Sequence, residues 1–221
     1  MVAQIIAIDG PAGAGKSTVA KDVAKQLGYV YIDTGAMYRA IALLAIKSQI
    51  AFDDQDSLTS LAKCTKITLL NEEDRLRIYC NDEDVTEAIR LDEVGNAASK
   101  VSTVFGVREA LVDQQRRLAA GGKVVLDGRD IGSVVLPNAD CKIFLTASVE
   151  ERCRRRVAEM KVRGFEADEA NIAEQIRERD YRDSHRQHSP LTQAADAVLI
   201  DSSDLEIEEV VDKVLVIAYS R

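Results

Sequence analysis

The chain has 221 residues, of which 46% are hydrophobic and 30% charged, so it holds enough apolar material for one globular core and is not expected to be disordered. Its formal net charge of −8 disfavours a protein that coats a nucleic acid polymer, because such binding depends on excess cationic charge. No apolar run reaches the roughly 18 residues that a membrane-spanning helix needs, and MVAQIIAIDG lacks the features of a signal peptide, so we expect a cytoplasmic protein with no membrane partner.

Five short segments rich in β-branched or apolar residues are predicted to be buried parallel strands. They alternate with helical patterns, which indicates an α/β fold with a mainly parallel sheet. One helix is expected over residues 16–27, closed by Gly28, and another begins at Ser148, where Ser148 and Glu151 have the spacing of a capping box. The predicted strands are residues 4–9, 29–33, 123–127, 141–146 and 197–201.

The alternation of strands and helices is interrupted over approximately residues 57–90. There, ITLL, the turn NEED and RLRIYC predict an antiparallel hairpin, and the acidic stretch NDEDVTEAIR follows it. Helical patterns over residues 92–104 and 107–120 then lead to the third predicted strand. We interpret 57–90 as an insertion within a single domain that covers residues 1–221.

The cysteines lie far apart and form no C-x-x-C pair. This distribution argues against a zinc site and against a dense disulfide framework. We therefore expect buried free thiols at Cys64, Cys80, Cys141 and Cys153.

A glycine-rich motif, Gly10-x-x-x-x-Gly15-Lys16-Ser17, lies between a predicted strand and a predicted helix, which is the context that a P-loop requires. Glycines let backbone N–H groups turn inward around phosphate oxygens, and the N-terminal end of the next helix favours negative charge. Lys16 is expected to reach the β- and γ-phosphates of ATP, and the Ser17 hydroxyl to bind Mg²⁺. The predicted ATP-Mg²⁺ site comprises Gly10, Pro11, Ala12, Gly13, Ala14, Gly15, Lys16, Ser17 and Thr18.

Two other readings of this motif fit less well. In a glycine-rich turn that binds nothing, a lysine and a serine after the last glycine serve no turn geometry. A dinucleotide fingerprint would need Gly or Ala at Thr18 and would not include Lys16. Asp127, which ends the apolar stretch VVLD, is a further candidate for the Mg²⁺ shell, although many parallel strands end in Asp.

Three polar clusters indicate where a phosphoryl acceptor would bind. DTGAMYR contains Arg39, which could bind a phosphate, although a capped helix with a solvated arginine is the alternative. LDGRD places Arg129 beside two carboxylates, and a loop salt bridge explains this pattern equally well. The stretch from Arg152 to Arg163 is either a solvated helix face or a mobile lid whose arginines stabilise the transferred phosphoryl group.

The motifs together resemble the bacterial cytidylate kinase family, whose members phosphorylate CMP and dCMP with ATP. The resemblance spans nearly the whole chain, and the motifs occur in the family's order. The matching stretches are IDGPAGAGKST, IDTGAMYRA, EVGNAASKVSTVFGVREAL, LDGRDIGSVVLPNADCKIFLTAS, ERCRRR and ERDYRDSHR.

The resemblance implies a P-loop NTPase-type three-layer α/β fold with a five-stranded parallel sheet. It also implies that residues 57–90 are a hairpin-containing insertion that binds the nucleoside monophosphate, and that residues 150–166, approximately, form an arginine-rich lid. The catalytic cations implied by the resemblance are Lys16, Arg129, Arg152 and Arg156, with Arg154 or Arg155 as the alternative for the lid arginines.

The resemblance further implies an acceptor site with three parts. Thr34 and Arg39 would meet the acceptor phosphate, together with Arg129. A carboxylate facing N4 and an arginine facing O2 suit the hydrogen-bonding groups of cytosine. The residues that resemble the family's cytosine readers are Ser99, Arg108 and Asp130, and those near the ribose hydroxyls are Arg179, Asp183 and Arg186.

The expected reaction transfers a phosphoryl group from ATP-Mg²⁺ to CMP or dCMP in a monomeric enzyme. One alternative is a P-loop kinase for another small acceptor, such as UMP, shikimate or gluconate. A second alternative is a nucleotide-dependent switch that hydrolyses ATP or GTP. Such a switch is expected to carry a guanine-specific N-K-x-D-type motif, which this sequence lacks. His185 and His188 are expected to be exposed, because an ionised acceptor phosphate needs no general base.

Overall fold

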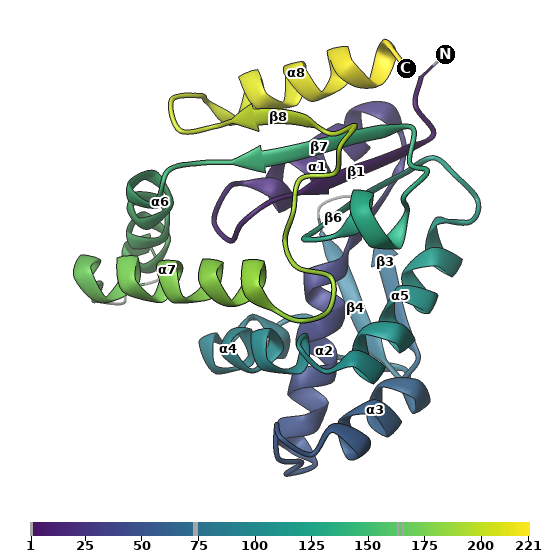
Figure 1. The fold of residues 1–221 in the computed structure, drawn as a ribbon, viewed down its shortest axis with the longest axis vertical. Helices are drawn as coiled ribbons and strands as arrows, with labels where there is room; N and C mark the ends of the chain where they lie inside the picture. The colour runs from purple at the N-terminus through teal and green to yellow at the C-terminus, as the bar shows by residue number, and fades with distance from the viewer. Residues whose placement is uncertain (1, 73–74, 163, 165) are drawn as a thin grey trace. The chain divides into compact units, whose positions relative to one another are not determined.

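The computed structural model describes residues 2–72, 75–162, 164 and 166–221. The chain divides into two compact units. The first comprises the residues up to Tyr29 together with Lys123–Arg221, and the second comprises Val30–Gly122. Figure 1 follows the chain through both units.

A five-stranded sheet has the order β2-β6-β1-β7-β8. Strand β1 pairs in parallel with both β6 and β7, and β7 pairs in parallel with β8. Four of the five residues of β1 are buried, as expected for a strand covered on both faces. The strands are β1 (Ile5–Asp9), β2 (Val30–Asp33), β6 (Val124–Gly128), β7 (Cys141–Thr146) and β8 (Val198–Asp201).

The five predicted strands are confirmed, and each predicted end lies within one residue of the observed one. The third strand begins at Val124 because Lys123 has a φ of 54°, a left-handed conformation that no strand residue adopts. In the parallel ladder, Asp9 lies opposite both Gly128 and Phe144, so the carboxyl ends of β1, β6 and β7 meet at one edge of the sheet.

In the first unit, helices α1 and α8 pack on each other and against the sheet, whereas α6 and α7 pack on each other. The predicted end of α1 is confirmed: Gly28 has a φ of 67°, and its N–H donates to the carbonyls of Ala24 and Lys25. These helices are α1 (Lys16–Leu27), α6 (Val149–Val162), α7 (Glu169–His185) and α8 (Ile207–Tyr219), and a π-helical turn η2 covers Ile131–Val135.

The capping box predicted at the start of α6 is half wrong. Ser148 Oγ does accept the Glu151 N–H at 3.1 Å. In a full capping box the Ser148 N–H would donate to the Glu151 carboxylate, but here it donates to Ser203 Oγ at 2.9 Å. The Glu151 carboxylate instead accepts from Arg154 and Arg155, since these cations offer charge-assisted bonds that a neutral N–H cannot match.

The second unit contains the predicted hairpin. Strands β3 (Ile67–Asn71) and β4 (Leu76–Cys80) pair antiparallel, and β5 (Glu83–Asp84) adds a short third strand. Of the predicted turn NEED, Glu73 and Asp74 lie outside the described residues. The helices of this unit are α2 (Thr34–Lys47), α3 (Gln55–Cys64), α4 (Asp92–Val101) and α5 (Phe105–Ala119), with the 3₁₀ turn η1 (Ala88–Arg90) before α4.

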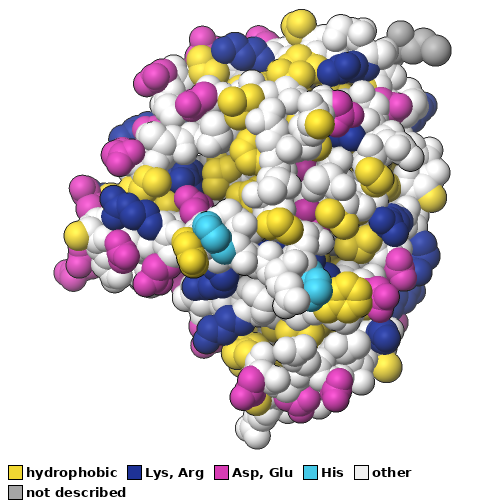
Figure 2. All heavy atoms as spheres, viewed as in Figure 1, with side chains coloured by type: hydrophobic (Ala, Val, Ile, Leu, Met, Phe, Trp, Pro, Cys, Tyr) yellow, Lys and Arg dark blue, Asp and Glu magenta, His cyan; other side chains and the backbone are white. Residues whose placement is uncertain are grey.

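The four cysteines are free thiols, as predicted. Three of them are buried, but Cys64 is exposed at the end of α3, so the expectation of burial is wrong for that residue. Within the described ranges, no helix is long and apolar enough to cross a membrane. On the face drawn in Figure 2, positive and negative side chains are interspersed.

Candidate functional site

The P-loop backbone has the conformation that its glycines predict. Gly10, Gly13 and Gly15 have φ values of 147°, 79° and 89°. A Cβ built at Gly10 would lie 1.9 Å from the carbonyl oxygen of Leu145, so no other residue fits there. Gly15 is the N-cap of α1 and supplies no side-chain cap, which leaves the first N–H groups of the helix for an anion.

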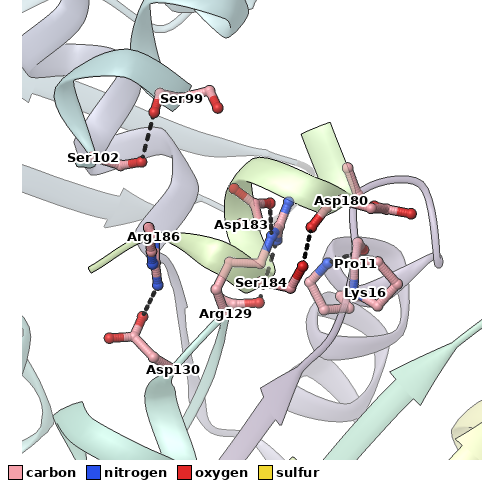
Figure 3. Close-up of polar contacts among 12 residues, drawn as sticks. Pro11, Lys16, Ser99, Ser102, Arg129, Asp130, Asp180, Asp183, Ser184 and Arg186 are labelled. Atoms are coloured by element: carbon pink, nitrogen blue, oxygen red, sulfur yellow. Dashed lines mark hydrogen bonds and ion pairs between the residues drawn. The ribbon is translucent and has the colours of Figure 1, made fainter. Parts of the chain in front are cut away.

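Lys16 is buried at the start of α1, and its Nζ donates to the carbonyl of Pro11 at 2.7 Å (Figure 3). Burial, together with the cations Arg129 and Arg179, lowers the pKa of Lys16 to about 7. The carboxylates of Asp127 and Asp9 act in the opposite direction and raise it. The site therefore concentrates positive charge that has little solvent around it. A bound polyphosphate would compensate this charge.

Ser17 and Asp127 are joined by a hydrogen bond of 2.8 Å from Ser17 Oγ to the Asp127 carboxylate. Asp127 belongs to β6 and is buried. One hydroxyl and one carboxylate are hard oxygen donors of the kind that hold Mg²⁺ together with substrate phosphates and water. Among the described residues, no group of three or more His, Cys, Asp and Glu could hold a metal ion by itself.

Asp9 ends β1 immediately before the P-loop, and its side chain is buried. Its carboxylate accepts the N–H of Ile131 at 2.8 Å and the N–H of Gly132 at 2.7 Å. Burial raises the pKa of Asp9 to about 6, although the two N–H donors counteract this effect. The sequence analysis did not single out Asp9, although its position at a strand end is the signal that identified Asp127.

Arg129 and Asp183 form an ion pair with a distance of 2.8 Å from Nε to the carboxylate (Figure 3). Asp183 lies on α7 and is buried. Burial pushes the pKa of Asp183 upward, but the guanidinium groups of Arg129 and Arg179 outweigh this, and the pKa is lowered overall. The structure thus brings together three residues that the sequence analysis assigned to the acceptor phosphate and the ribose.

Asp130 and Arg186 form a second ion pair, at 3.4 Å. Both side chains are buried, and Arg186 Nε donates to the carbonyl of Ser189 at 2.5 Å. The buried Asp130 carboxylate therefore has a guanidinium beside it. A carboxylate oxygen in this position can accept hydrogen bonds from a ligand.

Thr34 and Arg39 lie on α2 in the second unit. Asp33 caps this helix by accepting the Ala36 N–H at 2.9 Å, and Thr34 is buried as its first residue. The capped helix that the sequence analysis weighed as an alternative is therefore present. Arg39 is half-buried and makes no hydrogen bond or ion pair with any residue that the structure describes, which leaves its guanidinium open to an anion.

Ser99 and Arg108 lie on α4 and α5, and Ser102 connects them. Ser102 Oγ donates to the carbonyl of Ser99 at 2.9 Å (Figure 3), and the Ser102 carbonyl accepts from Arg108 Nη1 at 3.4 Å. The Arg108 guanidinium also lies over the ring of Tyr38, 5.6 Å from its centroid. Ser102 and Tyr38 were not predicted as site residues, and only the tertiary contacts identify them.

Arg152 is buried on α6 and engages four of its five N–H donors, one from Nε, two from Nη1 and one from Nη2. Nη1 and Nη2 donate to Asp180 at 2.9 and 2.6 Å, and Nη1 also donates to the carbonyl of Ala12 in the P-loop at 3.1 Å. This arginine ties α6 and α7 to the phosphate-binding loop.

The remaining arginines of α6 are more exposed. Arg156 pairs with Glu159 at 2.9 Å, and Arg154 pairs with Glu151 at 2.7 Å. Arg155 also pairs with Glu151 and donates to the carbonyl of Ser202 at 2.6 Å. Arg163, the last arginine of the predicted lid, lies outside the described residues.

His185 is exposed, as expected, and its ring stacks on Tyr181 with a centroid distance of 4.0 Å. His188 is partly exposed.

Comparisons with known proteins agree on one family. A sequence model of the family described as cytidylate kinase matches residues 6–220. A curated cytidylate kinase from Geobacillus sp. (strain WCH70) is 54% identical over 98% of this chain and 96% of its own length. The cytidylate kinase of Bacillus subtilis (strain 168) is 51% identical over 95% of this chain and 94% of its own length.

Solved structures share the fold at low sequence identity. An uncharacterised protein from Eubacterium ventriosum has a TM-score of 0.56 and 14% identity, with 98% of each chain covered. A gluconokinase from Sinorhizobium meliloti has a TM-score of 0.50 and 16% identity, with 99% of this chain and 93% of that chain covered. At these identities the likeness shows the fold alone.

Proposed function

Because this chain belongs to the cytidylate kinase family and transfers a phosphoryl group from ATP to CMP, we propose specific roles for its residues in that reaction. The observation that carries the proposal is the cluster of three cations in which the partly buried Arg129 and Arg179 lie near the buried Lys16 of the P-loop. Phosphoryl transfer involves little covalent chemistry by the protein, so positioned cations are its main catalytic means.

On the donor side, the backbone N–H groups of the P-loop, to which Pro11 contributes none, cradle the phosphates of ATP. Lys16 Nζ leaves the carbonyl of Pro11 and binds the β- and γ-phosphates as a point charge. Ser17 and Asp127 would hold Mg²⁺, which supplies electrostatic stabilisation of the phosphate oxygens when bound.

On the acceptor side, we assign the phosphate of CMP to Thr34, Arg39 and Arg129. Arg39 supports this assignment because its half-buried guanidinium makes no ion pair with a described residue. Arg129 is held by Asp183, which orients the guanidinium without neutralising all of its donors. The acceptor oxygen is already ionised near neutral pH, so no side chain has to remove a proton.

We assign the cytosine base to Asp130, Arg108 and Ser99. Asp130 is a buried acceptor suited to the N4 amino group, whereas Arg108 offers donors suited to O2 and N3. Uracil carries an acceptor where cytosine carries N4, so a carboxylate there repels it. This chemistry favours CMP over UMP.

We assign the ribose hydroxyls to Arg179, Asp183 and Arg186. Asp183 and Arg186 form ion pairs with Arg129 and Asp130, so the same pairs that order the site would also hold Asp183 and Arg186 in position for the sugar. Acceptance of dCMP is part of the proposal.

We assign the lid role to α6 and its arginines over approximately residues 150–166. A modest rotamer change would turn the Arg156 guanidinium away from Glu159 and toward the transferred group, since both side chains of this ion pair are partly exposed. Arg152, engaged by Asp180 and the P-loop carbonyl of Ala12, would act by holding the loop against the transferred group. We also propose a monomer located in the cytoplasm.

The testing experiment is an ADP-release assay with ATP-Mg²⁺ and a panel of acceptors: CMP, dCMP, UMP, AMP, GMP, shikimate and gluconate. We expect CMP and dCMP to be used best and UMP less well. Equal use of CMP, AMP and GMP would contradict the assignment of the base-reading residues. ADP release that is independent of any acceptor would instead favour a nucleotide-dependent switch.

A further inference from the structure

The buried carboxylate of Asp9 uses both of its oxygens on one short segment of backbone. Oδ1 accepts the N–H of Ile131 and Oδ2 accepts the N–H of Gly132, at 2.8 and 2.7 Å. These are the first two residues of the π-helical turn η2. Asp9 itself is 122 and 123 residues away in the sequence, at the end of β1.

The start of a helical turn normally obtains such bonds from its own N-cap residue. The N-cap residue here is Asp130, a good capping residue by type, yet its side chain makes no cap hydrogen bond. Its carboxylate lies beside Arg186 instead. Asp9 therefore performs the capping that Asp130 would otherwise perform, and the Asp130 carboxylate is directed elsewhere.

The surroundings show that this contact is closely fitted. Asp9 is 5% exposed and Gly132 is buried. A Cβ built at Gly132 would lie in ordinary contact with Asp9 Oδ2, at 3.5 Å, and 3.1 Å from Cδ of Lys142, so the side chains of Asp9 and Lys142 both pack closely on this glycine. Two charge-assisted bonds in a site with little water hold a backbone segment more firmly than neutral bonds do.

Each of the two elements joined by this contact is adjacent in the sequence to residues of the proposed active site. Asp9 precedes Gly10, the first residue of the P-loop, and η2 directly follows Arg129 and Asp130. A shift of η2 would move the backbone that carries both acceptor-binding side chains. One carboxylate therefore links the donor-phosphate loop to the acceptor-binding loop within the first unit.

We propose that Asp9 is a positioning residue that caps η2 from β1 and thereby holds Arg129 and Asp130 in the geometry that binds CMP. This inference rests on the proposed function, since it takes Arg129 and Asp130 as acceptor-binding residues. Asp9 does not touch the substrate in this role, and its effect is transmitted through the backbone of η2.

The decisive variant is Asp9→Asn, which keeps the shape of the side chain but turns an NH₂ group toward one of the two N–H donors. We expect kcat/KM for CMP to fall by about tenfold or more, while the Kd of a fluorescent ATP analogue changes by less than about twofold. Equal losses on the ATP and CMP sides would overturn the proposal.

Asp140→Asn provides a matched control. Asp140 likewise accepts two consecutive N–H groups, those of Gln4 and Ile5, both at 2.9 Å, but it does so at the opposite end of β1. Loss of this contact should leave both the CMP and ATP parameters unchanged. A fall in kcat/KM for CMP equal to that of Asp9→Asn would mean that any weakening of β1 has this effect, and would contradict positioning by Asp9.

A double-mutant cycle with Asp130→Ala separates positioning from general support of the fold. If Asp9 acts through Asp130, the double variant should lose little more kcat/KM than the worse single variant. Losses that multiply would overturn the proposal. If Asp9→Asn does not fold, Asp9→Glu takes its place, because it keeps the carboxylate but displaces it by one methylene. Asp9→Glu should raise the KM for CMP with no change in ATP binding, and an unchanged KM for CMP would contradict the proposal.

The activity of the wild-type protein distinguishes failure of the proposed function from failure of the positioning role of Asp9. Absence of CMP-dependent ADP release from the wild type would refute the proposed function itself. Normal wild-type activity together with unselective or multiplicative losses in the Asp9 variants would refute only the positioning role.

Discussion

Arg152 and Asp180 form a two-bonded ion pair, with Nη1 and Nη2 donating to the two carboxylate oxygens at 2.9 and 2.6 Å. Arg152 is 4% exposed along its side chain, whereas Asp180 is 26% exposed. Because Nη1 also donates to the carbonyl of Ala12, the pair connects helices α6 and α7 with the P-loop. A guanidinium is needed for this arrangement, since a lysine ammonium cannot present parallel donors.

Arg152→Lys should therefore destabilise the protein and weaken ATP binding together. We expect the free energy of unfolding to fall by roughly 1.5 to 3 kcal/mol, as for hydrogen bonds to charged groups, and the Kd of ATP to rise. Urea unfolding and an ATP titration measure the two effects. Arg154→Lys is the control, because Arg154 is 75% exposed and its pair with Glu151 is a surface ion pair that contributes little to stability. Similar losses in both variants would contradict this account.

Lys16→Ala should abolish phosphoryl transfer. Loss of one preorganised cation at the transferred group costs on the order of 10²-fold or more in kcat. The folded state should survive, because the Nζ of Lys16 makes one hydrogen bond to Pro11, and thermal unfolding checks this. Lys25→Ala, at the exposed end of the same helix, should retain full activity in the ADP-release assay. Substantial transfer by Lys16→Ala would refute the role of Lys16.

ATP binding should be accompanied by proton uptake at pH 7.5. The pKa of Lys16 is lowered to about 7 by burial and by Arg129, so much of this lysine is neutral at pH 7.5 before the ligand binds. The negative phosphates raise the pKa again, and the protein takes up roughly half a proton or more. Calorimetry in buffers of different ionisation enthalpy measures the uptake. At pH 6, where Lys16 is already charged, the uptake should be close to zero.

Asp130→Ala should impair CMP use far more than ATP binding. The lost contact to N4 of cytosine is expected to cost about 1 to 3 kcal/mol in kcat/KM, together with a smaller preference for CMP over UMP. Arg186 also loses its partner in this variant, so Asp130→Asn is the matched comparison that keeps an oxygen at the site. An unchanged CMP-to-UMP ratio in both variants would remove Asp130 from the base-reading set.

Asp9 should make stability depend on pH in a way that Asp9→Asn does not. Burial raises the pKa of Asp9 from 3.8 to about 6, so its contribution to stability is fully present below pH 3.8 and is lost as the pH rises through 6. Between pH 5 and pH 7.5 the wild type should lose on the order of 1 kcal/mol relative to Asp9→Asn. Urea unfolding of both proteins at the two pH values tests this, and a constant difference would contradict it.

Local sequence patterns were sufficient for most of the fold. The five strands and the helix closed by Gly28 could be predicted because hydrophobic period, strand length and glycine at a helix end act over a few residues. The P-loop was equally readable, since its glycines, Lys16 and Ser17 are consecutive. The capping box at Ser148 failed because Glu151 had a better partner in Arg154 and Arg155 than the local N–H.

What the sequence by itself determined is the family and the phosphate-binding loop, whereas the arginines and the carboxylate that it assigns to the acceptor stay predictions. Tertiary structure alone decided how these groups are held. The pairs Arg152–Asp180 and Arg129–Asp183, and the contact between Asp9 and η2, each join residues that are 28 to 123 positions apart. Pairings of this kind depend on which strands and helices become neighbours after folding, and no local pattern in the sequence carries that information.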